Sequence, residues 1–189
     1  MSRWEPDARG RLERAALELY SERGFEQTTA AQIAERAGLS ERTFFRHYAD
    51  KREVLFGGAQ LLEGAFVETL AAVPAAVGPM DAMASTLEAL SDFFADRHEF
   101  ARRRQAVIAA NVELQERELI KLATLTAALS TTLRGRGVGE AAASLVAEVG
   151  VAVFKVGFER WLRAEGGALS SFLREALLEL RVVVGPPPR

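Results

Sequence analysis

The stretch TTAAQIAERAGLSERTFFRHYADK, residues 28–51, carries the pattern that decides the fold. Its apolar residues recur at helical spacing, and a glycine divides them into two short segments. Thr28 or Thr29 can cap the first segment, and Ser40 can cap the second. Two short helices joined by the turn AGLS (residues 37–40) predict a helix-turn-helix, whose second helix can enter the major groove of DNA.

The second of these segments contains two adjacent phenylalanines, and a helical wheel assigns them different surroundings. With Phe44 as the zero direction and about 100° per residue, Tyr48 falls at about 40°, on the core side. Arg42 and Arg46 fall near roughly 160° and 200°, on the far side, and Phe45 lies on the border at about 100°. We therefore expect Phe44 to anchor the helix and Phe45 to meet the surface against which the helix docks.

The flanking sequence predicts further helices on both sides. Apolar residues from Leu12 to Tyr20 follow the spacing of an amphipathic helix, which Gly24 would end as its αL residue. Asp50 can cap a fourth helix, with Glu53 at the capping-box position. That helix would continue to about residue 72, before the break at Val73-Pro74.

The remainder of the chain also reads as helical, with no strand-like alternation. We expect further helices at roughly these ranges: residues 81–97, 99–112, 115–134, 139–165 and 169–184. The predicted fold is all-α, with about nine helices: an N-terminal three-helix helix-turn-helix domain and a C-terminal helical domain. The predicted boundaries are residues 1–56, residues 57–184 and a disordered tail at residues 185–189.

Composition narrows the classes of function. The chain has 189 residues, no cysteine, two histidines and a net charge of -2. Disulfides, thiolate metal sites and a cysteine nucleophile are thereby excluded, and no cofactor, metal site or enzymatic motif is expected. Residues 1–56 carry ten basic and ten acidic side chains, so nucleic-acid binding has to be judged from the position of charges.

The N-terminal residues lack the apolar region of a signal peptide, and the longest apolar stretch is interrupted by charge. That stretch, residues 141–158, contains Glu148 and Lys155, and it is shorter than the roughly 20 apolar residues that a membrane-spanning helix needs. We expect a cytoplasmic protein with no membrane partner.

The segment RLERAALELYSERGFEQTTAAQIAERAGLSERTFFRHYADKREVLF, residues 11–56, resembles the N-terminal DNA-binding domain of TetR-family transcriptional regulators. The resemblance lies in AALELYSERGF at the end of the first helix, in TTAAQIAERAGLS, and in TFFRHYADK. It implies a double-stranded DNA operator as partner.

The resemblance also implies roles for individual residues. Phosphate contacts are implied for four of them: Thr29, Thr43, His47 and Lys51. Contacts to bases or to the DNA backbone are implied for three others: Glu41, Arg42 and Arg46. The family typically has Tyr at the position of Phe45, so this chain keeps the ring at the DNA backbone and lacks the hydroxyl.

The C-terminal part contains aromatic residues that could line an apolar cavity between helices. The candidates, together with one polar contact, are Phe66, Phe93, Phe94, Phe100, Ile108, Asn111, Phe154, Phe158 and Trp161. Ordinary core packing is the alternative interpretation for each apolar member of this set. The resemblance implies a small-molecule effector here.

Two helices in the same part have broad apolar faces that predict a homodimer interface. The candidate interface residues are Leu145, Val149, Val153, Leu169, Phe172, Leu173, Ala176, Leu177 and Leu180. Gly150 and Gly157 would permit a close approach of helices there. Burial of these faces within one chain is the alternative.

These observations predict a ligand-responsive transcriptional regulator, a repressor, that binds a pseudo-palindromic operator as a dimer and is released by a small apolar effector. The alternative is a helical small-molecule carrier or protein-interaction module that no longer reads DNA. Loss of DNA binding on substitution of Arg46 and Lys51 would separate the two.

Overall fold

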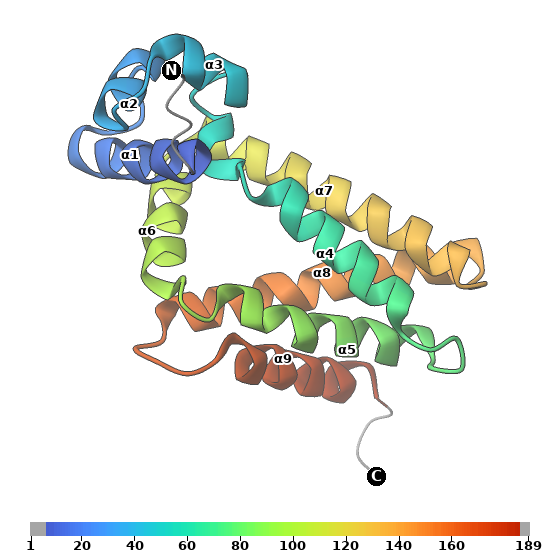
Figure 1. Cartoon of the computed structure of the whole chain (residues 1–189). Coiled ribbons are helices and arrows are strands. Elements are labelled where there is room, and N and C mark those ends of the chain that lie inside the picture. The colour runs from blue at the N-terminus through green and yellow to red at the C-terminus, as the bar shows by residue number, and fades with distance from the viewer. Residues whose placement is uncertain (1–6, 186–189) are drawn as a thin grey trace. The chain divides into compact units, whose positions relative to one another are not determined.

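The structure, a computed structural model, describes residues 7–185, and its regular elements are helices (Figure 1). These residues contain nine α-helices, two 3-10 helices (η1 and η2) and no strand, which confirms the all-α prediction. The elements are α1 (Ala8–Arg23), α2 (Ala30–Arg36), α3 (Glu41–His47), η1 (Glu53–Phe56), α4 (Ala59–Ala72), α5 (Pro79–Leu90), η2 (Ser91–Phe94), α6 (His98–Ala109), α7 (Val112–Gly135), α8 (Glu140–Arg163) and α9 (Leu169–Val184). Of the predicted tail at residues 185–189, residues 186–189 lie outside the described residues.

The caps of the helix-turn-helix form as the sequence predicts. Thr29 caps α2: its side chain accepts the backbone N–H of Gln32 at 3.2 Å, and the Gln32 side chain accepts the backbone N–H of Thr29. Ser40 caps α3 by accepting the backbone N–H of Thr43 at 3.2 Å. These caps satisfy backbone donors that the first turn of a helix leaves without partners.

Two glycines terminate the first helices with different geometries. Gly38, after α2, has a φ of 67°, which favours glycine, and the Arg11 guanidinium donates to its carbonyl oxygen and to that of Ala37. Gly24 ends α1 as predicted, but its φ of 87° and ψ of 156° are not those of an αL residue. A bend at Phe25 and a turn at residues 26–27 follow it, so the predicted αL cap is wrong.

The predicted fourth helix is divided into two pieces. Asp50 Oδ1 accepts the backbone N–H groups of Arg52 at 2.8 Å and Glu53 at 3.1 Å. The N-cap position of η1 is nevertheless Arg52, not Asp50, and the Glu53 carboxylate accepts from the Arg117 guanidinium. The chain then forms η1 and passes through Gly57 and Gly58 before α4 begins. Glycine is a poor helix former, which accounts for the interruption.

The contacts divide the chain into two compact units, and the first comprises Met1–Gln60 and Glu99–Ile120. Its core contains apolar side chains of α1, α2, α3 and η1, together with Val107, Ile108 and Leu114 of α6 and α7. Arg104 of α6 donates to the carbonyl oxygen of Leu55 at 2.7 Å. Residues 99–120 thus pack with the helix-turn-helix. The domain boundary at residue 56, suggested by the sequence, stays a prediction.

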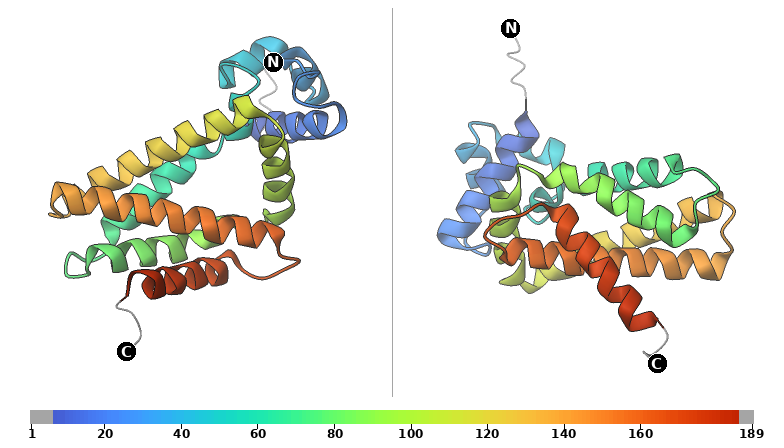
Figure 2. Two further views of the ribbon diagram at one scale, coloured as in Figure 1. Left: turned by 180° about the vertical axis from the view of Figure 1, so that it is seen from behind. Right: turned by 90° about the horizontal axis from the view of Figure 1, so that it is seen from below.

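The second unit comprises Leu61–His98 and Lys121–Arg189, and its centre is the contact of α8 with α5 and α9. Figure 2 shows α8 following α7 through a short turn. A Cβ atom on Gly150 would lie 2.6 Å from Met83 Cγ of α5, and one on Gly157 would lie 3.1 Å from Leu173 Cα of α9. These glycines therefore permit close helix contacts within one chain.

Two helical segments are long and apolar enough to cross a membrane by length and composition alone: Glu53–Ala72 and Glu140–Arg163. A core helix of a soluble protein passes the same test. The first segment is not a continuous α-helix, because it includes η1 and the glycine pair. The second is α8, which buries nine residues, including Ala147, Phe154 and Trp161, within the second unit.

Candidate nucleic-acid interface

Helix α3 separates its two phenylalanines as the wheel predicts. Phe44 is fully buried, whereas the Phe45 side chain is 52% exposed, with its ring centroid 5.3 Å from that of Phe44 in an edge-on arrangement. Tyr48 is buried on the same side as Phe44, and its hydroxyl donates to Glu13 Oε1 of α1 at 2.9 Å. Phe45 is thus a large apolar side chain that this unit leaves in solvent.

The exposed face of α3 carries cations that form no ion pair within the part of the chain that the structure describes. Glu41, Arg42 and Arg46 are exposed, and no ion pair is recorded for either arginine within residues 7–185. Arg9 at the start of α1 is also exposed, and its guanidinium lies 5.7 Å from the centroid of the Tyr48 ring. Sequence reasoning missed Arg9, because nothing in the sequence indicates that the start of α1 approaches the end of α3.

The three other predicted phosphate contacts, Thr29, Thr43 and His47, differ in exposure. Thr29 is exposed, and Thr43 is half-buried, with its hydroxyl 2.9 Å from that of Ser40. His47 is half-buried, and its Nε2 has no hydrogen-bond partner within the described part of the chain. Burial, followed by the charges of Arg46 and Arg9, lowers the pKa of His47, so its imidazole is neutral near pH 7.

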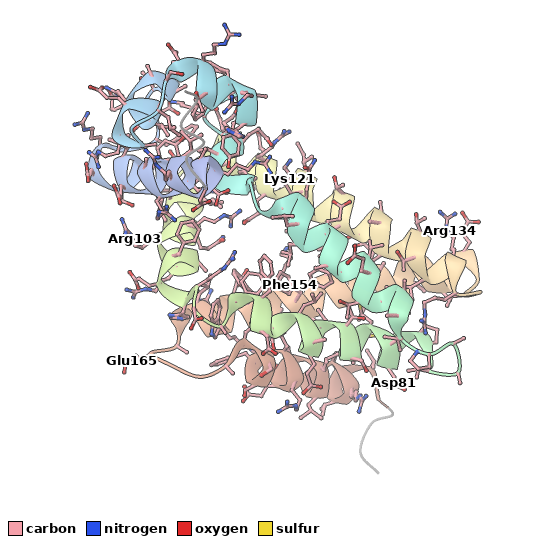
Figure 3. The ribbon with its side chains drawn as sticks, viewed as in Figure 1. Asp81, Arg103, Lys121, Arg134, Phe154 and Glu165 are labelled. Carbon is pink, nitrogen blue, oxygen red and sulfur yellow. The ribbon has the colours of Figure 1, made fainter. Side chains whose placement is uncertain are left out.

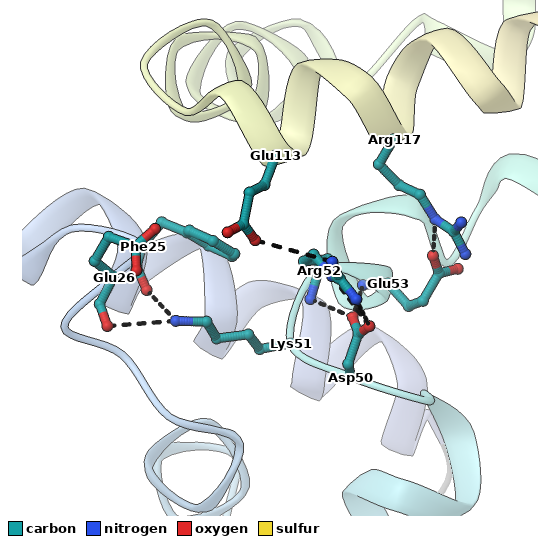
Figure 4. Close-up of polar contacts among 8 residues, drawn as sticks. All are labelled: Phe25, Glu26, Asp50, Lys51, Arg52, Glu53, Glu113 and Arg117. Atoms are coloured by element: carbon teal, nitrogen blue, oxygen red, sulfur yellow. Dashed lines mark hydrogen bonds and ion pairs between the residues drawn. The ribbon is translucent and has the colours of Figure 1, made fainter.

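Lys51 is placed differently from the expectation. Its Nζ donates to the backbone carbonyl oxygens of Phe25 at 2.9 Å and Glu26 at 3.3 Å (Figure 4), and to that of Thr28 at 3.1 Å. It also lies 4.3 Å from the centroid of the Phe25 ring. An ammonium group has three donors, and here each has an acceptor. The predicted phosphate contact stays a prediction, and the protein without DNA already engages the ammonium group that would make it.

Six of the predicted ligand residues form one aromatic cluster in the second unit. The ring of Phe94 lies 5.2 Å from that of Phe158, 6.1 Å from Phe154 and 6.2 Å from Trp161. Phe66 meets Phe154 edge-on at 5.6 Å, and Phe93 meets Phe94 at 5.2 Å. Phe154 projects from α8 (Figure 3) and stacks on Phe158 at 5.4 Å.

Three other predicted ligand residues belong to the first unit. Ile108 is fully buried in the core of that unit, and Phe100 packs against the same core. The Asn111 side-chain amide donates to the carbonyl oxygen of Val107 at 2.6 Å. The predicted ligand residues are therefore divided between the two units. For Ile108 and Phe100 the structure agrees with the alternative interpretation, core packing.

The predicted dimer residues stay a prediction, and they differ in how far the single chain already buries them. Val153, Leu169, Leu173 and Ala176 are buried within a single chain, because α9 packs on both α8 and α5. Phe172, Leu177 and Leu180 are half-buried, and so is Val149 of α8. Only Leu145 of the predicted set is well exposed, at 66%. The buried members are consequently unavailable to a partner in this conformation.

Comparison with known proteins gives matches to both parts of the chain. Residues 13–56 match the family described as bacterial regulatory proteins, tetR family, and residues 77–184 match the MftR C-terminal domain. The chain is 42% identical to the transcriptional regulator TcmR of Streptomyces glaucescens over 82 residues, which are 43% of this chain and 36% of TcmR. The match thus spans about a third of that relative.

Two further relatives match most of the chain. A protein of Mycobacterium tuberculosis (strain ATCC 25618 / H37Rv), MftR, named for the regulation of mycofactocin biosynthesis, is 27% identical over 85% of this chain and 83% of its own length. This chain also resembles the solved structure of FadR, a TetR-family repressor of Thermus thermophilus in complex with lauroyl-CoA. The two chains are 26% identical in sequence, their TM-score is 0.51, and the match covers 96% of each.

The first of the two family matches covers the helix-turn-helix, and the second covers most of the helical second unit. The two family models confirm the resemblance in the sequence. The chain belongs to the TetR family of bacterial regulatory proteins.

Proposed function

We propose that this protein is a repressor that binds a pseudo-palindromic operator as a homodimer. The observation that carries the proposal is the exposed face of α3. There Phe45 is 52% exposed and Arg42 and Arg46 form no ion pair within residues 7–185, while Phe44 and Tyr48 are buried. Arginine pairs with the O6 and N7 atoms of guanine, and an apolar side chain suits a thymine methyl group or sugar. Two copies of α3 would read two half-sites about one helical turn apart, roughly 34–36 Å.

The dimer would use the apolar residues that the single chain leaves in solvent on α8 and α9. On α8, Leu145, Val149 and Val156 follow helical spacing, and Leu145 and Val156 are 66% and 44% exposed. On α9, Leu178 and Val182 are 55% and 81% exposed. Exposed apolar residues grouped on two neighbouring helices are a feature of protein–protein interfaces.

The effector would be a small, largely apolar molecule that binds at the aromatic cluster of the second unit. Such a cluster offers apolar contact area with few polar groups, which suits an alkyl or aromatic ligand. The FadR relative was solved with lauroyl-CoA, so acyl chains are the first ligands to examine. Release of DNA requires that the effector bind more tightly to a conformation that does not fit the operator.

A titration of operator DNA against the protein, with and without acyl-CoA thioesters of increasing chain length, tests this function. We expect affinity for DNA to fall about five- to 150-fold with the best effector, the range of a typical coupling free energy. Phe158→Ala should weaken that response and leave the affinity of the effector-free protein for DNA unchanged. Tighter DNA binding with the thioester would instead make it a corepressor.

The alternative function is a cytoplasmic carrier or protein-interaction module with no catalytic role and no DNA partner. It would bind the apolar ligand with the same affinity but would show no preference among DNA sequences. Arg42→Ala and Arg46→Ala would then change nothing measurable, whereas a regulator loses its affinity for the operator.

A further inference from the structure

Ion pairs join the segment that follows the recognition helix α3 to the first two turns of α7 (Figure 4). Arg117 Nε donates to Glu53 Oε1, and the Glu53 side chain is only 17% exposed. The Arg52 guanidinium lies 3.9 Å from Glu113 Oε2. A base and an acid on this segment thus meet an acid and a base on α7, and complementary charges of this kind fix the register of two packed surfaces.

Arg104 of α6 holds the next residues of the same segment. Its Nε donates to the carbonyl oxygen of Leu55 at 2.7 Å, and its guanidinium lies 4.9 Å from the centroid of the Phe56 ring. Its Nη1 donates to Glu118 Oε1 of α7 at 3.3 Å. The Arg104 side chain is 21% exposed, and a cation that is mostly buried needs such partners. One arginine therefore connects η1 with both α6 and α7.

Two features leave the orientation of η1 to these charged contacts. Gly57 and Gly58 separate η1 from α4, and glycine allows the backbone a wide range of conformations. The apolar side chains of η1 are buried in the core of the first unit, but apolar burial is not directional. Hydrogen-bonded ion pairs have a defined geometry, so they can set the orientation in which η1, and α3 before it, is held.

We propose that the ion pair of Glu53 with Arg117 positions the recognition helix for the operator and thereby couples α7 to operator binding. Both residues act through α3, and neither contacts DNA. The proposal deepens the proposed operator interface and rests on it. Helix α7 is continuous from residue 112 to residue 135, and its residues up to 120 belong to the first unit. Because coupling is reciprocal, operator DNA must then alter α7, as a shift of α7 alters the affinity for DNA.

A double-mutant cycle on the affinity for an inverted repeat, enriched from a random pool of double-stranded DNA, tests the pair. We expect Glu53→Gln and Arg117→Gln each to bind about three- to tenfold more weakly, because the binding-competent placement of α3 is less populated. The double variant should bind no more weakly than either single variant, since both substitutions remove the same contact.

Two comparisons separate this loss from a general effect of charge. Glu53→Gln removes a negative charge, which by long-range electrostatics alone would raise the affinity for DNA, so a loss indicates displacement of α3. Arg102→Gln is the matched control for Arg117→Gln. It removes the same charge from an exposed ion pair with Glu99 on α6, and it should change the affinity less than about twofold.

Hydrogen exchange gives a readout that a purely structural ion pair would not move. We expect DNA to slow amide exchange in residues 112–120 of the wild-type protein but not of Arg117→Gln. Unchanged affinity of the single variants, additive losses in the double variant, or wild-type exchange that DNA does not slow would each overturn the proposal. If a variant does not fold, the exchange of the wild-type protein decides. Failure of the operator interface itself would be seen separately, because the wild-type protein would then bind no preferred DNA.

Discussion

Phe45 and Phe44 are neighbours in the sequence with opposite surroundings, so the same substitution should have different effects at the two positions. Phe45→Ala should leave the free energy of unfolding nearly unchanged and lower DNA affinity about threefold to tenfold, through the loss of roughly 1 kcal/mol of apolar contact. Phe44→Ala should destabilise the protein by roughly 3–5 kcal/mol, because it empties a fully buried site. Urea unfolding and fluorescence anisotropy with labelled DNA measure the two quantities.

A gain of affinity is expected for Phe45→Tyr, since it restores the hydroxyl that related proteins have at this position. A destabilised Phe45→Ala protein would contradict the assignment of Phe45 to the exposed face.

His47 should make both stability and DNA binding depend on pH, with opposite signs. Its folded-state pKa is lowered, so the unfolded chain binds the proton first, and stability falls as the pH drops below about 6.5. A DNA phosphate near His47 favours the charged imidazole, so affinity for the operator should rise as the pH falls across the same range. Anisotropy titrations of labelled DNA with the wild-type protein and with His47→Gln, at several pH values, measure this dependence of affinity on pH.

The other histidine supplies the control. His98 lies in the second unit, where its Nε2 is 2.9 Å from the carbonyl oxygen of Trp161. His98→Gln should retain the pH dependence of DNA affinity, and His47→Gln should lose it. If the wild-type affinity does not change with pH, His47 does not contact a phosphate.

At the scale of elements, glycines set the distance between α8 and its neighbours. Gly157→Ala would bring a methyl group to 2.8 Å from Leu173 Cδ2 and 3.1 Å from the Leu173 Cα, so α9 must shift, at a cost of about 1–3 kcal/mol. Gly64→Ala in α4 meets no atom within 4 Å and should stabilise the protein by roughly 0.5–1 kcal/mol. Urea unfolding of both variants measures this. Equal stability of the two variants would refute the close α8–α9 contact.

Sequence patterns predicted the helices well because their signals are local. The caps at Thr29 and Ser40, and the apolar spacing of Phe44 and Tyr48, depend on residues a few positions apart. The contacts of the Lys51 ammonium group could not be predicted, because its acceptors are main-chain oxygens more than 20 residues away. Main-chain oxygens are present at every residue, so no sequence pattern indicates which of them face a lysine.

At the scale of the whole molecule, the broad apolar face of α9 also shows that a sequence pattern does not identify the segment against which a residue packs. The pattern from Leu169 to Leu180 correctly indicates burial, but it does not say whether the same chain or a second copy buries it. The structure uses both α5 and α8 for that burial, and it leaves Leu145 and Val156 of α8 exposed. Residues 99–120 likewise pack with the helix-turn-helix, a contact between distant segments that periodicity cannot reveal.

The proposed dimer can be tested by placing a charge on the exposed α8 residues. Val156→Glu should weaken dimerisation at least about a hundredfold, because the carboxylate would lose its hydration without gaining a partner. Leu61→Glu in α4, at a site that is 66% exposed, is the matched control and should remain dimeric. Sedimentation velocity measures both. A dimeric Val156→Glu protein would place the interface elsewhere.

Selection of bound sequences from a random pool of double-stranded DNA tests the central claim most directly. We expect the wild-type protein to enrich an inverted repeat, and Arg42→Ala or Arg46→Ala to relax the preference at a symmetric pair of positions, at about 1–3 kcal/mol for each lost base contact. Arg103→Ala, which removes an exposed arginine of α6, should enrich the same repeat. A pool with no enriched sequence, and binding that disappears as salt rises, would contradict the claim that α3 reads an operator.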